Sequence, residues 1–263
     1  MHGDDVLILI ARAPLFLPLY ALILFRVSGL MLTAPIFGSE TLPIRLRAAL
    51  AAVISLTIFP VLAPRLPADL SMSEAVFGGL GEMMIGLIMG LSMSVMFAGV
   101  QLAGMVIGQQ AGLSLGQVFD PVTNNDTTII GQMFFIVAVM AFLLVGGHRE
   151  LMRALLDSFE AIPVLGFHDQ STALALLVRL VTGAFTLALR MAGPVLIALL
   201  VASVAMGFLS RTMPQLNILS VGFMLRAMLA IGATAIVISA DGSVITDAIV
   251  GTIEAIREAF HLL

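Results

Sequence analysis

Long apolar runs alternate along the chain with short clusters of charged residues, proline and glycine. A helix needs about 20 mostly apolar residues to cross the hydrocarbon core of a membrane. Six runs approach or exceed this length, at residues 15–34, 46–63, 75–100, 127–145, 174–209 and 216–240. The pattern predicts an all-α integral membrane protein, with about six hydrophobic helical segments in a single membrane domain over residues 1–263.

Two apolar stretches are too long for one simple crossing. Residues 83–119 contain no charged side chain, and 174–209 is interrupted by Arg179, Arg190 and the pair Gly193-Pro194. Proline ends or kinks a helix, and irregular backbone at membrane depth is tolerated where protein buries it or where it lines a cavity. We therefore expect bent or broken helices in both stretches.

Two further segments have a helical period with one polar face. In residues 149–162 and in the C-terminal tail, residues 243–263, isoleucine, leucine and phenylalanine repeat on one side. These residues are Leu151, Leu155, Phe159 and Ile162, and then Ile245, Ile249, Ile253, Ile256 and Phe260. We predict that each segment lies at the membrane interface or docks on a partner.

Composition narrows the classes of function. The chain is 60% hydrophobic and 11% charged, and its formal net charge of -4 provides no broad basic surface for nucleic acid. Without cysteine there is no disulfide or thiolate zinc site. The four histidines are scattered and no nucleotide-binding motif is present, so we predict no metal and no cofactor. We expect the first apolar segment to be retained, because no basic signal-peptide region precedes it.

Residues 112–116 have the G-x-S-x-G spelling of a hydrolase nucleophile elbow, with Ser114 at its centre. The strand and sharp turn that such an elbow requires are not visible in the pattern. Glycines recur here every four residues, at Gly104, Gly108, Gly112 and Gly116. This is the spacing of closely packed membrane helices. An intramembrane serine protease, with His148 as the base, is the alternative.

The four-residue spacing extends backward along the chain to Gly86 and Gly90. Gly86, Gly90 and Gly104 are therefore candidates for close helix packing, either within this chain or between subunits. Glycine costs about 1 kcal/mol relative to alanine in a helix, and residues 104–116 combine four glycines with neighbouring glutamines. We predict an easily unwound, flexible element that lines or closes a path and ends at Phe119-Asp120-Pro121.

Methionine and arginine provide two more groups of candidates. Met89, Met93 and Met96 share one helix face and could seal a pore, although methionine at this spacing is also ordinary core packing. Ionisable residues within apolar runs are costly against lipid. They are Arg26, Glu82, Arg179, Arg190 and Arg226. For Arg179, Arg190 and Arg226 we predict contact with a neighbouring subunit, with structural pairing or snorkelling as the alternative.

Three stretches together resemble the FliR family, the flagellar member of a type III secretion export-gate family with a virulence counterpart. They are FRVSGLMLTAPIFGSETLPIRLRAALA from Phe25, GQQAGLSLGQVFDP from Gly108 and PQLNILSVGFMLRAMLAIG from Pro214. With the length and segment order, the resemblance covers nearly the whole chain. One departure is Met224, where the family often has proline.

The resemblance implies a subunit of bent helical hairpins that joins several copies of FliP and FliQ in a ring and works with an FlhB-like export switch protein. Residues 1–172 would then be FliP-like and 173–263 a FliQ-like hairpin. Residues 108–121 would be similar to a plug loop beside a methionine constriction. The residues assigned to this loop are Gly108, Gln109, Gln110, Gly112, Gly116, Gln117, Phe119, Asp120 and Pro121.

The function implied is that of a non-enzymatic channel subunit in the bacterial inner membrane, at the flagellar basal body. It would help to form and plug the path of unfolded flagellar proteins. The alternatives are the virulence counterpart and a secondary transporter for a small solute, with broken helices around a midplane site.

Overall fold

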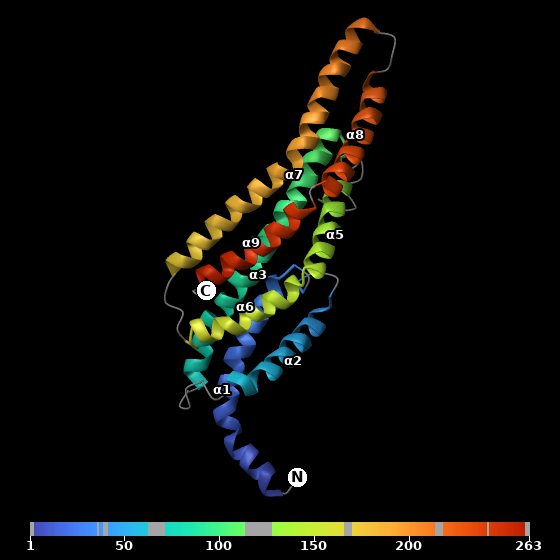
Figure 1. Ribbon diagram of the computed structural model, residues 1–263. Coiled ribbons are helices and arrows are strands. Elements are labelled where there is room, and N and C mark those ends of the chain that lie inside the picture. The colour runs from blue at the N-terminus through green and yellow to red at the C-terminus, as the bar shows by residue number, and fades with distance from the viewer. Residues whose placement is uncertain are drawn as a thin grey trace. The chain divides into compact units, whose positions relative to one another are not determined.

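The computed structural model describes residues 3–35, 37–38, 42–62, 72–113, 128–165, 170–213, 218–240 and 242–260, and its regular elements there are all helices (Figure 1). They are α1 (Gly3–Thr33), α2 (Ile44–Leu62), α3 (Met72–Ala111), α5 (Ile129–Leu144), α6 (Gly147–Ala161), α7 (Gln170–Thr212), α8 (Ile218–Ala240) and α9 (Ser243–Ala259). The all-α prediction is confirmed.

Membrane-length segments are fewer than the six apolar runs suggest. Within the described ranges, four helices are long and apolar enough to cross a membrane, at Ile44–Leu62, Gly78–Ala111, Leu174–Thr212 and Ser220–Ser239. Helices α5 and α6 meet at 64° and provide a fifth span only if the bent pair counts as one. The first apolar run forms only a shorter apolar stretch, Leu17–Thr33, within α1.

The two longest helices do not break where the sequence predicts. Helix α7 continues through Pro194 over 43 residues, and α3 continues through Gly104 and Gly108 over 40 residues. Pro194 removes one backbone hydrogen bond, to the carbonyl of Arg190, whereas ending the helix in an apolar environment would leave several groups unpaired. The predicted breaks are therefore wrong at Gly193-Pro194 and before Gly112, whereas bending of these helices and easy unwinding of residues 104–116 stay predictions.

The chain packs as two compact units that interleave along the sequence. The first unit contains residues Met1–Ser94, His148–Val178 and Thr252–Leu263, and the second contains Val95–Gly147 and Arg179–Gly251. Helices α3, α7 and α9 each contribute residues to both units. This division follows packing and differs from the predicted boundary between residues 172 and 173. That boundary concerns likeness to FliP and FliQ and stays a prediction.

The core of the first unit joins α1 and α3 to α6 and the end of α9. Val27 and Met89 are fully buried there, together with Leu155 of α6 and Ile256 of α9. The apolar faces of α6 and α9 are thus turned inward, as their period predicts, while Arg153, Asp157 and Glu254 remain exposed. In the first unit these faces pack on the chain's own core, and not on a membrane interface or a partner as expected.

The second unit combines a small aromatic core with wide apolar outer faces. The ring of Phe97 packs edge to face against Phe135 and Phe142, with centroids 5.8 Å apart in both pairs. Outward-facing residues of α7 and α8 remain uncovered by the chain, among them Leu189, Ile197, Phe208, Met224 and Met228. Lipid or other subunits must cover these faces in the membrane.

Candidate functional site

Helix α3 ends at the point where the predicted plug loop begins. Gly112 follows the last helical residue with φ 81°, a left-handed conformation that favours glycine. Its N–H donates to the carbonyl of Gln109 at 3.0 Å, and the N–H of Leu113 donates to that of Gly108 at 2.9 Å. This pair of bonds is the Schellman cap that closes many helix C-termini. Gly112 therefore stops the helix and fixes the direction in which the chain leaves it.

The chain returns to the same helix at Thr128. This residue is the N-cap of α5, and its buried hydroxyl accepts a hydrogen bond from the N–H of Gly131 at 3.1 Å. The same hydroxyl donates to the carbonyl of Gly104 on α3 at 3.1 Å. One side chain thus caps α5 and ties its start to α3.

Three glycines allow this close approach of α3 and α5. A Cβ at Gly104 would lie 2.5 Å from the backbone of Gly131, and a Cβ at Gly108 would lie 2.8 Å from the side chain of Thr128. Gly131 sits in the facing position, with the backbone of α3 and Thr128 as its nearest neighbours. We call Gly104, Gly108, Gly112, Thr128 and Gly131 the loop base. It holds the two ends of residues 113–128 against one stretch of α3.

The structure describes only the first part of the predicted plug loop. Gly108, Gln109 and Gln110 belong to the last turn of α3, and both glutamines are exposed. Gly112 lies in the cap. Five predicted members and the serine of the hydrolase motif lie outside the described residues: Gly116, Gln117, Phe119, Asp120, Pro121 and Ser114.

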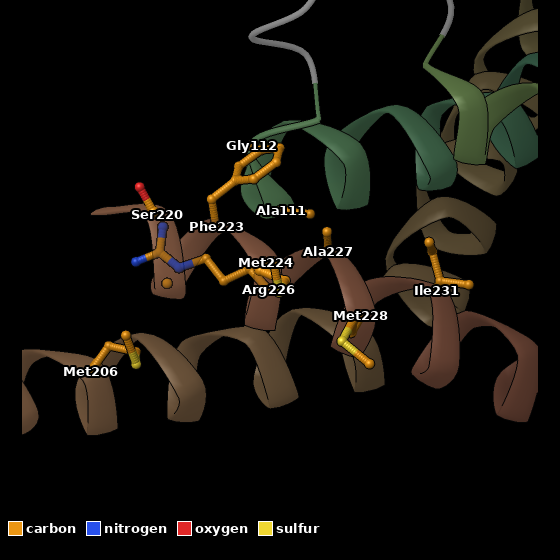
Figure 2. A pocket seen from close by; sticks show the side chains of 11 residues that line it. Ala111, Gly112, Met206, Ser220, Phe223, Met224, Arg226, Ala227, Met228 and Ile231 are labelled. Atoms are coloured by element: carbon orange, nitrogen blue, oxygen red, sulfur yellow. The ribbon is translucent and has the colours of Figure 1, made fainter. Parts of the chain in front are cut away.

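A cavity of about 840 Å³ adjoins the cap in the second unit (Figure 2). The end of α3 contributes Ala111 and Gly112, α7 contributes Met206, and the rest of the wall belongs to α8. Most of the side chains in this wall are apolar, and Arg226 is the only charged residue among them. Its Nε is buried and has no hydrogen-bond partner within the described structure.

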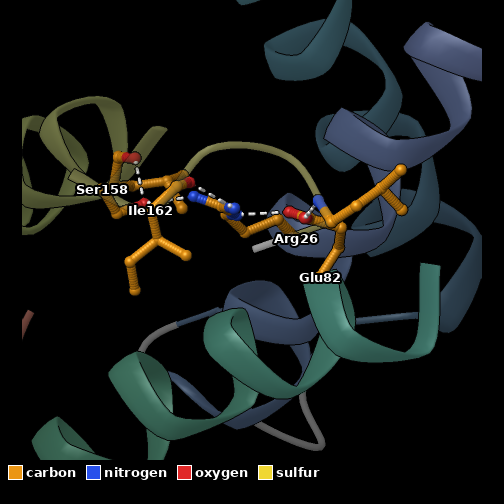
Figure 3. A network of polar contacts seen from close by, with 6 residues as sticks. Arg26, Glu82, Ser158 and Ile162 are labelled. Atoms are coloured by element: carbon orange, nitrogen blue, oxygen red, sulfur yellow. Dashed lines mark hydrogen bonds and ion pairs between the residues drawn. The ribbon is translucent and has the colours of Figure 1, made fainter. Parts of the chain in front are cut away.

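A buried polar network occupies the first unit (Figure 3). Nε of Arg26 donates to Oε2 of Glu82 at 2.6 Å, and the other two guanidinium nitrogens donate to the hydroxyl of Ser158 and the carbonyl of Ile162. The second carboxylate oxygen of Glu82 accepts from the N–H of Leu165 at 3.0 Å. The network therefore joins α1, α3 and α6 and fixes the chain as it leaves α6.

The other predicted glycines bring α1 close to α3. A Cβ at Gly86 would overlap the carbonyl of Arg26, and one at Gly90 would overlap the side chain of Thr33. Gly29 on α1 faces the same crossing, where a Cβ would overlap the carbonyl of Met83. At both crossings of α3, with α1 and with α5, the glycine spacing serves packing within this chain.

The remaining candidates divide between the interior and the surface. Met89, Met93 and Met96 are at most 4% exposed, as expected for core residues of their units. Arg179 and Arg190 are exposed on α7. Arg226 lines the cavity beside Gly112, whereas Arg179 and Arg190 are not among the described residues of its wall. Within the described ranges, no group of three or more His, Asp or Glu side chains is placed to hold a metal ion.

Sequence analysis missed Thr128, Gly131 and Gly29. The pair Thr127-Thr128 directly before an apolar run is a helix N-cap signal, so Thr128 could have been found. Arg26 and Glu82 were both noted as intramembrane ions, but nothing in their spacing of 56 residues indicates that they pair.

The chain is similar to known proteins over a range that includes both the loop base and the buried network. Residues 17–251 match the family described as bacterial export proteins, family 1. The chain is 33% identical over 223 residues to the flagellar biosynthetic protein FliR of Escherichia coli strain K12, and the match covers 84% of each chain. The chain belongs to the FliR family.

Other relatives support the same family. The FliR of Bacillus subtilis strain 168 is 29% identical over 251 residues, which covers 94% of this chain and 96% of the relative. The FliR of Pectobacterium carotovorum is 33% identical over 201 residues. The matched residues 17–251 include both the loop base and the Arg26–Glu82 network.

Proposed function

We propose that this FliR family member is a non-enzymatic channel subunit of the flagellar type III protein export gate in the bacterial inner membrane. The segment that follows Gly112 plugs the path of unfolded flagellar proteins while the gate is closed. The observation that carries this proposal is the loop base. The chain leaves α3 through the cap at Gly112 and contacts α3 again at the N-cap Thr128, as a plug that must be held in place requires.

The geometry of the loop base suits a closing element better than a catalytic one. Gly104 and Gly108 bring α3 within backbone contact of α5, which makes the anchor rigid. Beyond the cap, the sequence of the predicted plug loop includes Gly116, and glycine restricts backbone conformation least, which favours an element that can move. In this proposal the loop base stays fixed while the plug moves aside for cargo, and the plug then returns to the closed position.

The partners in this proposal are FliP-like and FliQ-like membrane subunits and an FlhB-like export switch protein. Arg190 supports a polar partner surface on α7, since it is exposed on a membrane-length helix. An arginine on such a helix is costly against lipid. The flagellar names of the relatives favour the flagellar gate over its virulence counterpart.

The anchor is tested by Thr128→Val, which keeps the shape of the side chain but removes its hydroxyl. Two buried groups, the N–H of Gly131 and the carbonyl of Gly104, would lose this partner. Each unsatisfied buried group costs about 1–3 kcal/mol. We expect the purified complex to assemble normally but to conduct ions in planar bilayers without cargo. The matched control is Thr57→Val on the exposed face of α2, whose hydroxyl bonds only within its own helix and whose loss should leave the closed gate tight.

Deletion of residues 114–117 tests the plug itself and leaves both anchors in place. We expect normal copurification with the other gate subunits and a higher conductance of the closed complex. An assembled complex with unchanged conductance would contradict the plug assignment. Failure to copurify with any other membrane subunit would contradict membership of a gate.

A further inference from the structure

The cavity beside Gly112 combines an apolar wall with a single cation. Met206 of α7 and Phe223 and Met228 of α8 line it, and Figure 2 shows these side chains around Arg226. Its volume of about 840 Å³ lies within the usual range of small-molecule sites. An occupant that matches this wall has a long apolar part and one anionic group.

Arg226 is the side chain in this cavity that can bind an anionic group. Its Nε is buried without a hydrogen-bond partner in the described part of the chain, and none of the described residues that line the cavity is acidic. Arg226 as a whole is partly exposed, and a guanidinium forms charge-assisted hydrogen bonds to carboxylate or phosphate oxygens. An incoming phosphate would supply the missing acceptor.

Arg226 lies in the first half of α8, and its side chain extends toward the start of the helix. Its Cα lies about 12 Å along the axis from the first residue of the helix, Ile218, at a rise of 1.5 Å per residue. Figure 2 shows the guanidinium extending back toward Ser220, near the start of the helix. Arginine near a helix end reaches the interface in this way. The opposite part of the wall, at Ile231, lies about 20 Å from the same helix start, at the depth of acyl chains.

We propose that this cavity binds an anionic phospholipid, with the headgroup phosphate on Arg226 and one acyl chain along Met206 and Met228. The methionines adapt to a flexible chain because they are unbranched. Both flanking helices, α7 and α8, are long and apolar enough to lie in a membrane, in which phospholipids surround the protein. The bound lipid would also contact Gly112, and thus the cap from which the predicted plug leaves α3. The site depends only on the chain lying in a membrane, and not on its proposed role in export.

The test is native mass spectrometry of the intact complex in detergent, with added phosphatidylglycerol and, in parallel, zwitterionic phosphatidylcholine. Arg226→Ala removes the cation, and Arg226→Lys retains it. Gly222→Leu fills the cavity without changing its charge, because a Cβ at Gly222 meets only the end of Met206, at 3.4 Å. The matched control is Gly232→Leu on the same helix, at a position that faces open space.

We expect the wild type to retain at least one phosphatidylglycerol, with roughly tenfold less retention in Arg226→Ala and in Gly222→Leu. Arg226→Lys and Gly232→Leu should retain it, and phosphatidylcholine should bind more weakly throughout. Equal retention by the wild type and Gly222→Leu would overturn the proposal. So would an equal preference for the two lipids, or a photocrosslinker at Met224 that captures an acidic segment of another subunit and no lipid.

Discussion

At the scale of single residues, the Arg26–Glu82 pair is the interaction most sensitive to change. Both side chains are almost fully buried, at 0% and 1% exposure, and all three guanidinium nitrogens have acceptors. The ring of Phe159 lies 4.0 Å from the guanidinium carbon and adds a cation–π contact. Removal of either charge leaves the other one buried without compensation.

We predict that Glu82→Gln lowers the free energy of unfolding by about 3–5 kcal/mol, the usual cost of breaking a buried ion pair from one side. The comparison is Glu150→Gln, which removes the partly exposed contacts with Arg153 and Arg257. Exposed pairs contribute about 0–1 kcal/mol. Thermal unfolding of the purified protein in detergent measures both changes. Equal losses for the two variants would show that the buried network is not a principal stabilising contact.

Residue types were easier to predict than their pairing. Arg26 and Glu82 stand out in the sequence because charges are rare in apolar runs, yet their contact depends on how α1 crosses α3. The same limit applies to Thr128, whose N-cap role is local whereas its bond to Gly104 is not. Local chemistry can be inferred from the chain, and contacts between distant segments require the fold.

At the scale of elements, glycine spacing on α3 determines how closely its neighbours approach. Gly86 contacts α1 and Gly104 contacts α5, in each case at a distance that excludes a Cβ. Close backbone contact of this kind is a main source of attraction between helices in a membrane. The spacing therefore encodes two helix crossings on one helix.

We predict that Gly86→Ala destabilises the protein by about 1–3 kcal/mol, because the added methyl group overlaps the backbone carbonyl of Arg26 and forces the helices apart. Gly232→Ala on α8 should have no cost or should stabilise its helix by up to about 1 kcal/mol, since no atom lies within 4 Å of the added group. The midpoint of thermal unfolding compares them. A Gly86→Ala protein as stable as the wild type would mean that this crossing tolerates separation.

Helical period predicted the buried faces of α6 and α9 but not what covers them. Leu155 and Ile256 point inward as expected, whereas the choice between membrane, partner and own core depends on tertiary packing. Pro194 and Gly104 do not mark helix ends, because α7 passes through the first and α3 through the second, whereas Gly112 does end α3. In an apolar environment the backbone's need for internal hydrogen bonds outweighs these local preferences.

At the scale of the whole molecule, the chain buries its membrane-length helices unequally. In α3, 56% of the most apolar stretch is buried by the chain itself, compared with 28% in α7 and 17% in α2 and α8. Helix α3 is therefore the internal support of the fold. Helices α2, α7 and α8 present most of their apolar surface outward, where lipid or other subunits must cover it.

If α7 lies against other gate subunits, a photoreactive side chain on its outer face should capture them. We predict that benzoylphenylalanine at Phe208, which is 69% exposed, cross-links to another polypeptide in intact membranes. The same group at Phe135, whose ring packs on Phe97 at 5.8 Å, should form products within the chain only. Mass spectrometry of the cross-linked bands identifies the captured protein. A Phe208 variant that captures lipid alone would place this face against the bilayer, and the exposed arginines of α7 would then need lipid headgroups in place of a partner subunit.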